Sequence, residues 1–288
     1  MTYFWGARTS CWLCGTKNRQ AVSRAWCVLS GLPDLDGRPA RPPWRMKAWV
    51  ERCAKCGYCA TDISQPKKYD LPVAPLPLHD ELWFAPAARP PSGTVAERRD
   101  SIQSVVRSTR YRAQLHNRSF PKLANSFWCE SLVDEAEERY GDAALAALRA
   151  AWVCDDAVRF KRARECRARV VELIDQAFKA NRWDGIFRTR WGMVKVDPLR
   201  RIGSFDSAAA ICREAFTDEP GQALRNVLQF QLELINRRYT AAYSLSDAMH
   251  WSPSAWGVEQ SIGGRAPRER SWLSSALAHG MDFILGNA

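Results

Sequence analysis

The sequence predicts a mainly α-helical protein in which a small N-terminal zinc-ribbon-like module precedes a TPR-like α-helical repeat domain. Three observations lead to this fold class. Two Cys-x-x-Cys-Gly motifs lie within the first 60 of the 288 residues. Apolar residues recur with a helical period from about residue 94 onward. No apolar run reaches the roughly 20 residues of a membrane-spanning helix, so an integral membrane protein is not expected.

The cysteines are distributed unevenly, with six of the ten in the first 59 residues. Residues 11–15 and 53–57 both have the pattern Cys-x-x-Cys-Gly. Two residues between cysteines allow one tight turn to direct both sulfurs at a single ion, and the glycine accommodates the positive φ of such a turn. Four thiolates from two turns form the closed tetrahedral set of a structural zinc site. We therefore predict one structural Zn²⁺ with the ligands Cys11, Cys14, Cys53 and Cys56.

Other roles for the cysteines compete with structural zinc. The 38 residues between the two motifs (residues 15–52) exceed the roughly 15–20 of a compact ribbon. Chance pairs of buried cysteines are therefore the alternative, but they do not account for the glycine after each pair. Thioredoxin-like redox catalysis is disfavoured, because neither motif stands in a strand–helix–strand pattern. Cys59 is a spare ligand, a reactive thiol or, as we favour, a small hydrophobic residue. The remaining cysteines in helical patterns, namely Cys129, Cys154 and Cys166, are expected in the core.

Composition and pattern divide the chain into four predicted parts. Residues 1–69 form the zinc-binding module, and the proline-rich residues 70–93 form an extended connector. Residues 94–250 form the TPR-like helical domain. Residues 251–288 form a C-terminal tail with a short capping helix near residues 268–285.

Local signals predict several helix boundaries. Thr94 and Glu97 have the spacing of a capping box, and another helix begins near Pro121. Gly141-Asp142 is predicted to end that helix and start the next, and Asp155-Asp156 to precede a further one. Pro198 is expected to kink a helix or delay its start. The helix after Asp156 carries an apolar face at helical spacing, made of Phe160, Ala163, Cys166, Val170, Ile174 and Ala177.

The same arrangement recurs later in the chain. Aligning Gly141-Asp142 with residues 203–206 suggests repeated helix–turn–helix pairs, each of which covers an apolar face of its neighbour. The repeat length is not a regular 34 residues, so the array is expected to be only TPR-like.

Several of these segments resemble one known family. They are residues 11–15, 33–39 (Pro-Asp-Leu-Asp-Gly-Arg-Pro), 53–60, 124–127, 150–156 and 199–248. The chain is similar to largely uncharacterised bacterial proteins, classed as a domain of unknown function, that join a two-knuckle, four-cysteine zinc module to TPR-like helices. The resemblance implies zinc ligation by the four cysteines named above, and it implies no substrate or reaction. Relatives often have a proline after the first cysteine of a knuckle, where this chain has Trp12 and Ala54.

The net charge of +11 is concentrated near the N-terminus. Residues 1–69 contain twelve Lys or Arg and four Asp or Glu, and a Zn²⁺ with four thiolates lowers the resulting +8 to about +6. One hypothesis is a nucleic-acid-binding module in which Arg45, Lys47 and Arg52 contact phosphates. Under this hypothesis, bases of the nucleic acid stack on Trp12, Trp26, Trp44 and Trp49. The favoured alternative is a solvated arginine-rich surface around tryptophans that fill a small metal-centred core.

The sequence contains no recognisable catalytic motif. The four histidines, His79, His116, His250 and His279, do not form a metal-binding pair. The acidic residues 135–138 are expected to form a solvated helix face, and Asp34, Asp36, Asp155 and Asp156 to cap turns or pair with arginine. We therefore expect a non-enzymatic adaptor that binds a protein or peptide partner through its helices. Because the N-terminus has no signal-peptide pattern, a cytoplasmic location is expected.

Overall fold

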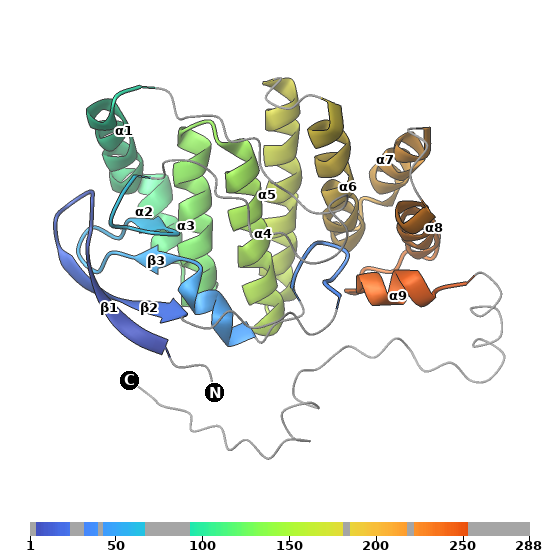
Figure 1. Ribbon diagram of the computed structural model, residues 1–288, viewed down its shortest axis with the longest axis horizontal. Helices are drawn as coiled ribbons and strands as arrows, with labels where there is room; N and C mark the ends of the chain where they lie inside the picture. The colour runs from blue at the N-terminus through green and yellow to red at the C-terminus, as the bar shows by residue number, and fades with distance from the viewer. Residues whose placement is uncertain are drawn as a thin grey trace, which may run out of the picture. The chain divides into compact units, whose positions relative to one another are not determined.

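The computed structural model describes residues 4–23, 32–39, 43–66, 93–180, 185–217 and 222–252. Within these ranges the protein is mainly helical, with an N-terminal cysteine cluster and two short antiparallel sheets (Figure 1). The predicted mainly α fold with a small N-terminal module is therefore confirmed. Met1–Met249 form one compact unit. Most of the predicted connector and the predicted helix near residues 268–285 lie outside the described residues.

Two hairpins form the N-terminal module. Their elements are β1 (Phe4–Ser10), β2 (Lys17–Ser23), the 3₁₀ helix η1 (Pro43–Ala48), β3 (Glu51–Arg52) and β4 (Cys59–Ala60). β1 pairs with β2 and β3 pairs with β4, both antiparallel. Along β2, Lys17 and Arg19 are exposed whereas Asn18 and Gln20 are buried, which is the alternation of a half-buried strand. Gln20 donates a side-chain hydrogen bond to the Arg52 carbonyl (3.3 Å), so the buried face of the first hairpin lies against the second.

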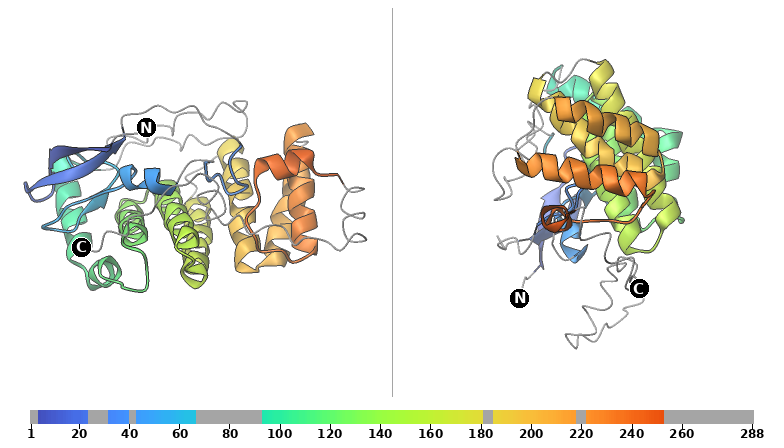
Figure 2. Two further views of the ribbon diagram at one scale, coloured as in Figure 1. Left: turned by 90° about the horizontal axis from the view of Figure 1, so that it is seen from below. Right: turned by 90° about the vertical axis from the view of Figure 1, so that its right-hand side faces the viewer.

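The helices follow one another through the rest of the described chain. They are α1 (Val95–Arg107), α2 (Thr109–Leu115), α3 (Lys122–Ala136), α4 (Tyr140–Asp156), α5 (Phe160–Lys179), α6 (Gly185–Ile202), α7 (Phe205–Thr217), α8 (Gln222–Asn236) and α9 (Leu245–His250). From α3 to α8 each helix packs against the next one in the chain (Figures 1 and 2). Sequential packing of this kind buries the apolar face of each helix against its neighbours.

The start of α1 confirms the predicted capping box. The Thr94 hydroxyl accepts a hydrogen bond from the Glu97 amide (3.2 Å), and the Glu97 carboxylate accepts one from the Thr94 amide (2.7 Å). These two bonds satisfy amides that a helix N-terminus otherwise leaves unpaired.

One type of turn closes several helices. At the end of α3, Glu138 has a φ of +57°, its amide donates to the Glu135 carbonyl, and the next amide donates to the Asp134 carbonyl. Equivalent pairs of bonds follow the positive φ of Val158, Gly203 and Arg238. This Schellman-like arrangement satisfies the last carbonyls of each helix. The turn predicted at Gly141-Asp142 is therefore wrong, because Gly141 lies buried inside α4 and the turn is three residues earlier.

The predicted apolar face of α5 is confirmed except at its first residue. Ala163, Cys166, Val170, Ile174 and Ala177 are all buried, but Phe160 is 55% exposed. Asp155 and Asp156 are the last residues of α4, and they precede α5 as predicted. The helix α6 passes through Pro198, and the predicted late start there is wrong.

The predicted solvated face of the acidic residues 135–138 is wrong for Glu135 and Glu137, although Glu138 is exposed. Glu137 lies against Arg98 (Oε1 to Nε, 2.8 Å), and Glu135 accepts from Arg169 (2.6 Å), and in each of these pairs both side chains are largely buried. The expected pairing with arginine is confirmed for Asp36, Asp155 and Asp156. Asp36, almost fully buried in the segment 32–39, accepts from the Trp152 indole (2.9 Å) and lies 3.4 Å from the Arg201 guanidinium. This segment is thereby fixed to α4 and α6.

The module and the helices share one hydrophobic core. A single cluster contains buried residues from both knuckles and from α1 to α5, together with Val194 of α6. It includes Leu13, Tyr58, Ile102, Phe127 and Val170. The position of the cysteine cluster is therefore fixed by the helices as well as by the hairpins.

Candidate metal centre

The first knuckle, residues 11–16, is the loop that joins β1 to β2. The Cys11 amide donates to the Thr16 carbonyl (2.9 Å), and the Gly15 amide donates to the Cys11 carbonyl (2.7 Å). Gly15 has a φ of +72°, which favours glycine because it has no Cβ. The loop therefore turns both cysteines of the motif toward the same side.

The second knuckle, residues 53–58, is the loop that joins β3 to β4 and repeats this pattern. The Cys53 amide donates to the Tyr58 carbonyl (2.9 Å), and the Gly57 amide donates to the Cys53 carbonyl (3.0 Å). Gly57 has a φ of +77°. The two Cys-x-x-Cys-Gly motifs thus fold into the same turn, as their common pattern predicts.

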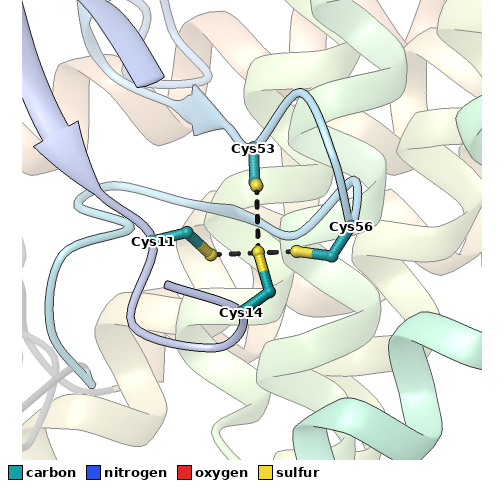
Figure 3. Close-up of side chains that lie close together, drawn as sticks. All are labelled: Cys11, Cys14, Cys53 and Cys56. Atoms are coloured by element: carbon teal, nitrogen blue, oxygen red, sulfur yellow. Dashed lines mark hydrogen bonds between the residues drawn. The ribbon is translucent and has the colours of Figure 1, made fainter. Parts of the chain in front are cut away.

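The two knuckles bring their four sulfurs together, as Figure 3 shows. All four Sγ atoms lie within 4.8 Å of one another. Across the knuckles, Cys11 Sγ lies 3.7 Å from Cys56 Sγ, and Cys14 Sγ lies 3.6 Å from Cys53 Sγ. A tetrahedral ion with metal–sulfur bonds of about 2.3 Å separates its sulfurs by about 3.8 Å. The cluster therefore has the dimensions of a four-sulfur metal site, and the four cysteines are positioned to hold one ion.

Polar groups next to the sulfurs tie the knuckles to each other. The Asn18 amide group donates to the Thr16 carbonyl (2.7 Å) and to Cys53 Sγ (3.6 Å), and its oxygen accepts from the Ala54 amide (2.8 Å). Asn18 is therefore bonded to both knuckles at once. Such groups around a metal site orient its ligands. Asn18 was not predicted from the sequence, although its place two positions after the first knuckle, on the buried face of β2, is the signal that marks it.

The thiols influence one another's protonation. The hydrogen bond from the Cys56 thiol lowers the pKa of Cys11 to about 5, and the same interaction raises the pKa of Cys56 above its ordinary value. One thiolate is therefore stabilised even in the metal-free cluster. A metal ion must displace the remaining thiol protons, so affinity for a cation rises with pH.

The other cysteines in the described residues lie outside this cluster. Cys59 is fully buried, and its thiol donates to the Gly57 carbonyl (3.3 Å). The predictions that Cys129, Cys154 and Cys166 belong to the core are confirmed, since each is fully buried. Across the ranges that the structure describes, the four knuckle cysteines form the one group of His, Cys, Asp or Glu arranged to hold a metal.

The residues predicted to contact nucleic acid differ in exposure. Lys47 is exposed on η1 and Arg52 is half-buried on β3, while the side chain of Arg45 lies outside the described residues. Of the tryptophans, Trp12 and Trp49 are half-buried, and the Arg149 guanidinium lies 5.5 Å from the centre of the Trp49 ring. Trp26 and the side chain of Trp44 lie outside the described residues. Another set of basic side chains, Arg8, Lys17 and Arg19, lies on the β1–β2 hairpin and was not predicted from the sequence as a group.

Comparison with known proteins adds no relative. No family model, curated protein or solved structure matches the chain. Within the described ranges, none of the helices combines the length and the apolar character required to cross a membrane.

Proposed function

We propose that the protein is a non-enzymatic adaptor, in which a structural Zn²⁺ stabilises the N-terminal module and TPR-like helices bind a protein or peptide partner. We also propose a cytoplasmic location, where a reducing environment keeps thiolates available for metal. The sequence resemblance to two-knuckle proteins of unknown function agrees with this proposal, since it implies the same two parts.

The identity of the metal follows from the donor set. Four cysteine sulfurs at tetrahedral separations favour zinc, because thiolates are soft ligands and Zn²⁺ accepts tetrahedral geometry without a preference of its own. Four protein ligands also leave no position for water or substrate, so the ion has a structural role.

Metal analysis of the protein purified under reducing conditions tests this assignment. We expect about one zinc per chain, and expect it to be lost from the Cys11→Ser/Cys56→Ser variant. Folded protein that contains iron, or no metal at all, would contradict the zinc proposal.

The observation that supports a protein partner is the turn between α4 and α5. Val158 is 64% exposed and Phe160 is 55% exposed, and they are two of the four large apolar side chains most exposed within the described residues. The exposed Arg159 and Lys161 alternate with them along the chain. We call the apolar pair Val158 and Phe160, with the two basic residues, the tip of this turn. The tip fits a partner segment in which an apolar side chain lies among acidic ones.

The backbone of this turn points to the same conclusion. Val158 has a φ of +56°, which a β-branched residue rarely adopts, while the corresponding turn before α7 has Gly203. Valine therefore lowers the stability of the turn, and its exposed side chain gains no compensating burial. A strained residue that the fold does not require is a reason to infer a role in binding.

Variants of the tip test the adaptor proposal. Proteins captured from the source cells by the wild-type chain are identified, expressed and titrated against purified variants. We expect Phe160→Ser to weaken binding by about tenfold or more. Val158→Gly should also weaken binding while leaving the melting temperature unchanged or higher, because glycine relieves the strain.

Val95→Ser is the matched control, since Val95 on α1 is 59% exposed and lies elsewhere in the sequence. Equal affinity of the Phe160→Ser and Val95→Ser variants for every captured protein would contradict a binding site at this turn.

A further inference from the structure

One face of the β1–β2 hairpin carries a group of basic side chains. In the antiparallel register Arg8 lies directly opposite Arg19, and Ser10 lies opposite Lys17. Arg8, Lys17 and Arg19 are exposed, whereas Asn18 and Gln20 between and beyond them are buried. Because successive side chains alternate between the two faces of a strand, the three cations share the solvent-facing side.

The placement of these cations opposite one another destabilises the hairpin when no anion is bound. Like charges directly opposite each other on neighbouring strands repel and destabilise the pair. No carboxylate within the described residues forms an ion pair with Arg8, Lys17 or Arg19. A bound polyanion removes the repulsion by placing negative charge between the two guanidinium groups.

The hairpin lies at the same end of the helical array as α1 and α2, and its loop is the first knuckle (Figures 1 and 2). A metal held by the two knuckles therefore fixes the loop end of the hairpin and its register. The three cations are presented on a two-stranded antiparallel ribbon, which is a shape that the major groove of duplex DNA admits.

We propose that this face of the β1–β2 hairpin binds duplex DNA, with Arg8, Lys17 and Arg19 contacting the phosphate backbone. The charge is complementary, and Arg and Lys are the usual phosphate ligands in such interfaces. This DNA-binding face is separate from the turn between α4 and α5 and does not depend on a protein partner there.

Two further observations favour duplex DNA over other polyanions. Binding of single strands relies on exposed aromatic rings on which bases stack, but Trp12 and Trp49 in the module are half-buried and Trp49 is covered by Arg149. Binding to an anionic membrane is strengthened by exposed apolar anchors. Among the module side chains whose exposure the structure describes, which leaves out those of residues 4–7, 21–23 and 43–45, no large apolar one is strongly exposed.

The test measures binding of the full-length, reduced and metal-loaded protein to a fluorescent 20-base-pair duplex of mixed sequence, by anisotropy at several salt concentrations. One variant, Arg8→Gln/Lys17→Gln/Arg19→Gln, neutralises the hairpin face. The matched control, Arg118→Gln/Lys122→Gln/Arg213→Gln, removes the same charge at exposed positions that form no ion pair within the described residues.

We expect the hairpin variant to bind roughly tenfold more weakly or worse, and the slope of log affinity against log salt to become shallower by about 2.7, or 0.9 for each lost phosphate contact. Its melting temperature should equal or exceed that of the wild type, because the opposed arginines no longer repel each other. The control variant should retain most of its affinity.

Equal loss of affinity in the two variants would overturn the proposal, as would tighter binding to a 20-nucleotide single strand or to phosphatidylserine vesicles than to the duplex. Absence of duplex binding by the wild type at low salt would also overturn it. If the triple variant melts below its control, the single variant Arg19→Gln is tested instead. A slope of log affinity against log salt that is shallower by about 0.9 supports the proposal, and an unchanged slope overturns it.

Discussion

The two knuckles have the same backbone but different surroundings. Both use the same pair of backbone hydrogen bonds and a glycine of positive φ. A Cβ added at Gly15 meets no atom within 4 Å, whereas one added at Gly57 lies 2.5 Å from Leu115 Cδ2 and 3.4 Å from Arg112 Nη1. The first knuckle is therefore open at its glycine, and the second is packed against α2.

The hydrogen bonds that connect the knuckles to the helices also differ, because those of the second knuckle are buried. Tyr111, buried on α2, donates to the Gly57 carbonyl (2.9 Å) and accepts from the Cys59 amide (3.1 Å). The first knuckle is bonded to the helices by the side chain of Arg99, an exposed residue that donates to the Leu13 carbonyl (3.1 Å). The local turn thus depends on the Cys-x-x-Cys-Gly pattern, while coupling of the metal site to the helices depends mostly on the second knuckle.

Removal of one metal ligand is expected to have the largest effect. Cys53→Ser should lose the metal and unfold both hairpins, because a structural zinc site contributes about 10–16 kcal/mol of apparent binding free energy. Most helical circular dichroism should remain, since α3 to α8 pack on one another. Hydrogen exchange should show that protection is lost in α2 more than in α1. Retention of one zinc per chain with unchanged affinity would show that Cys53 is not a ligand.

The glycines give the most direct comparison of the two knuckles. Gly15→Ala should destabilise the protein by about 1 kcal/mol, because alanine disfavours positive φ. Gly57→Ala should cost about 2–4 kcal/mol, since the same strain is joined by a clash with Leu115, which is held in the core. Urea unfolding of the metal-loaded protein measures both values.

Leu115→Ala provides the double-mutant test, because it removes the atom that the new Cβ meets. In this background the extra cost of Gly57→Ala over Gly15→Ala should largely disappear. Equal destabilisation by the two glycine substitutions in the wild type would contradict the difference between the knuckles.

The knuckle backbone is predictable from sequence because its determinants are local. Cys-x-x-Cys-Gly fixes the spacing of the sulfurs and the positive φ of the glycine. The capping box of Thr94 and Glu97 is predictable for the same reason, because both of its residues lie within one helical turn. The periodicity of α5 correctly places Cys166 and Ile174 in the core, because the period alone determines which positions share a face.

Features that depend on distant parts of the chain are not predictable in this way. The helix-ending turns carry Glu138 and Val158 at positive φ, where a sequence pattern leads one to expect glycine, so the turn is assigned wrongly to Gly141. Glu137 belongs to an acidic run of the kind expected on a solvated helix face, but it is largely buried because Arg98, from another helix, and Arg139 lie against it. The motif also does not predict that Gly57 packs on Leu115, because the motif is the same in both knuckles and only the second has this contact.

Asn18 tests whether the two knuckles act as one site. Asn18→Ala removes the bonds to Thr16, Cys53 and Ala54 together, so metal affinity should fall by about 10–100-fold, the usual cost of losing a group that orients metal ligands. Competition with a chromophoric chelator measures the affinity. Thr16→Val is the control, because Thr16 Oγ1 contacts Cys14 Sγ alone among the sulfurs (3.4 Å), and it should have a smaller effect. An unchanged metal affinity of the Asn18→Ala variant would show that the two knuckles hold the metal without the hydrogen bonds of Asn18.

The smallest expected effects distinguish the two connections to the helices. Tyr111→Phe keeps the ring in place but leaves the Gly57 carbonyl and the Cys59 amide without their partner, and it should destabilise the protein by about 1–2 kcal/mol. Arg99→Ala removes a hydrogen bond at an exposed side chain and should cost less than about 0.5 kcal/mol. Both values come from thermal or urea unfolding with saturating metal. If Arg99→Ala destabilises the protein as much as Tyr111→Phe, the first knuckle contributes equally to coupling, and the difference between the knuckles is confined to the glycines.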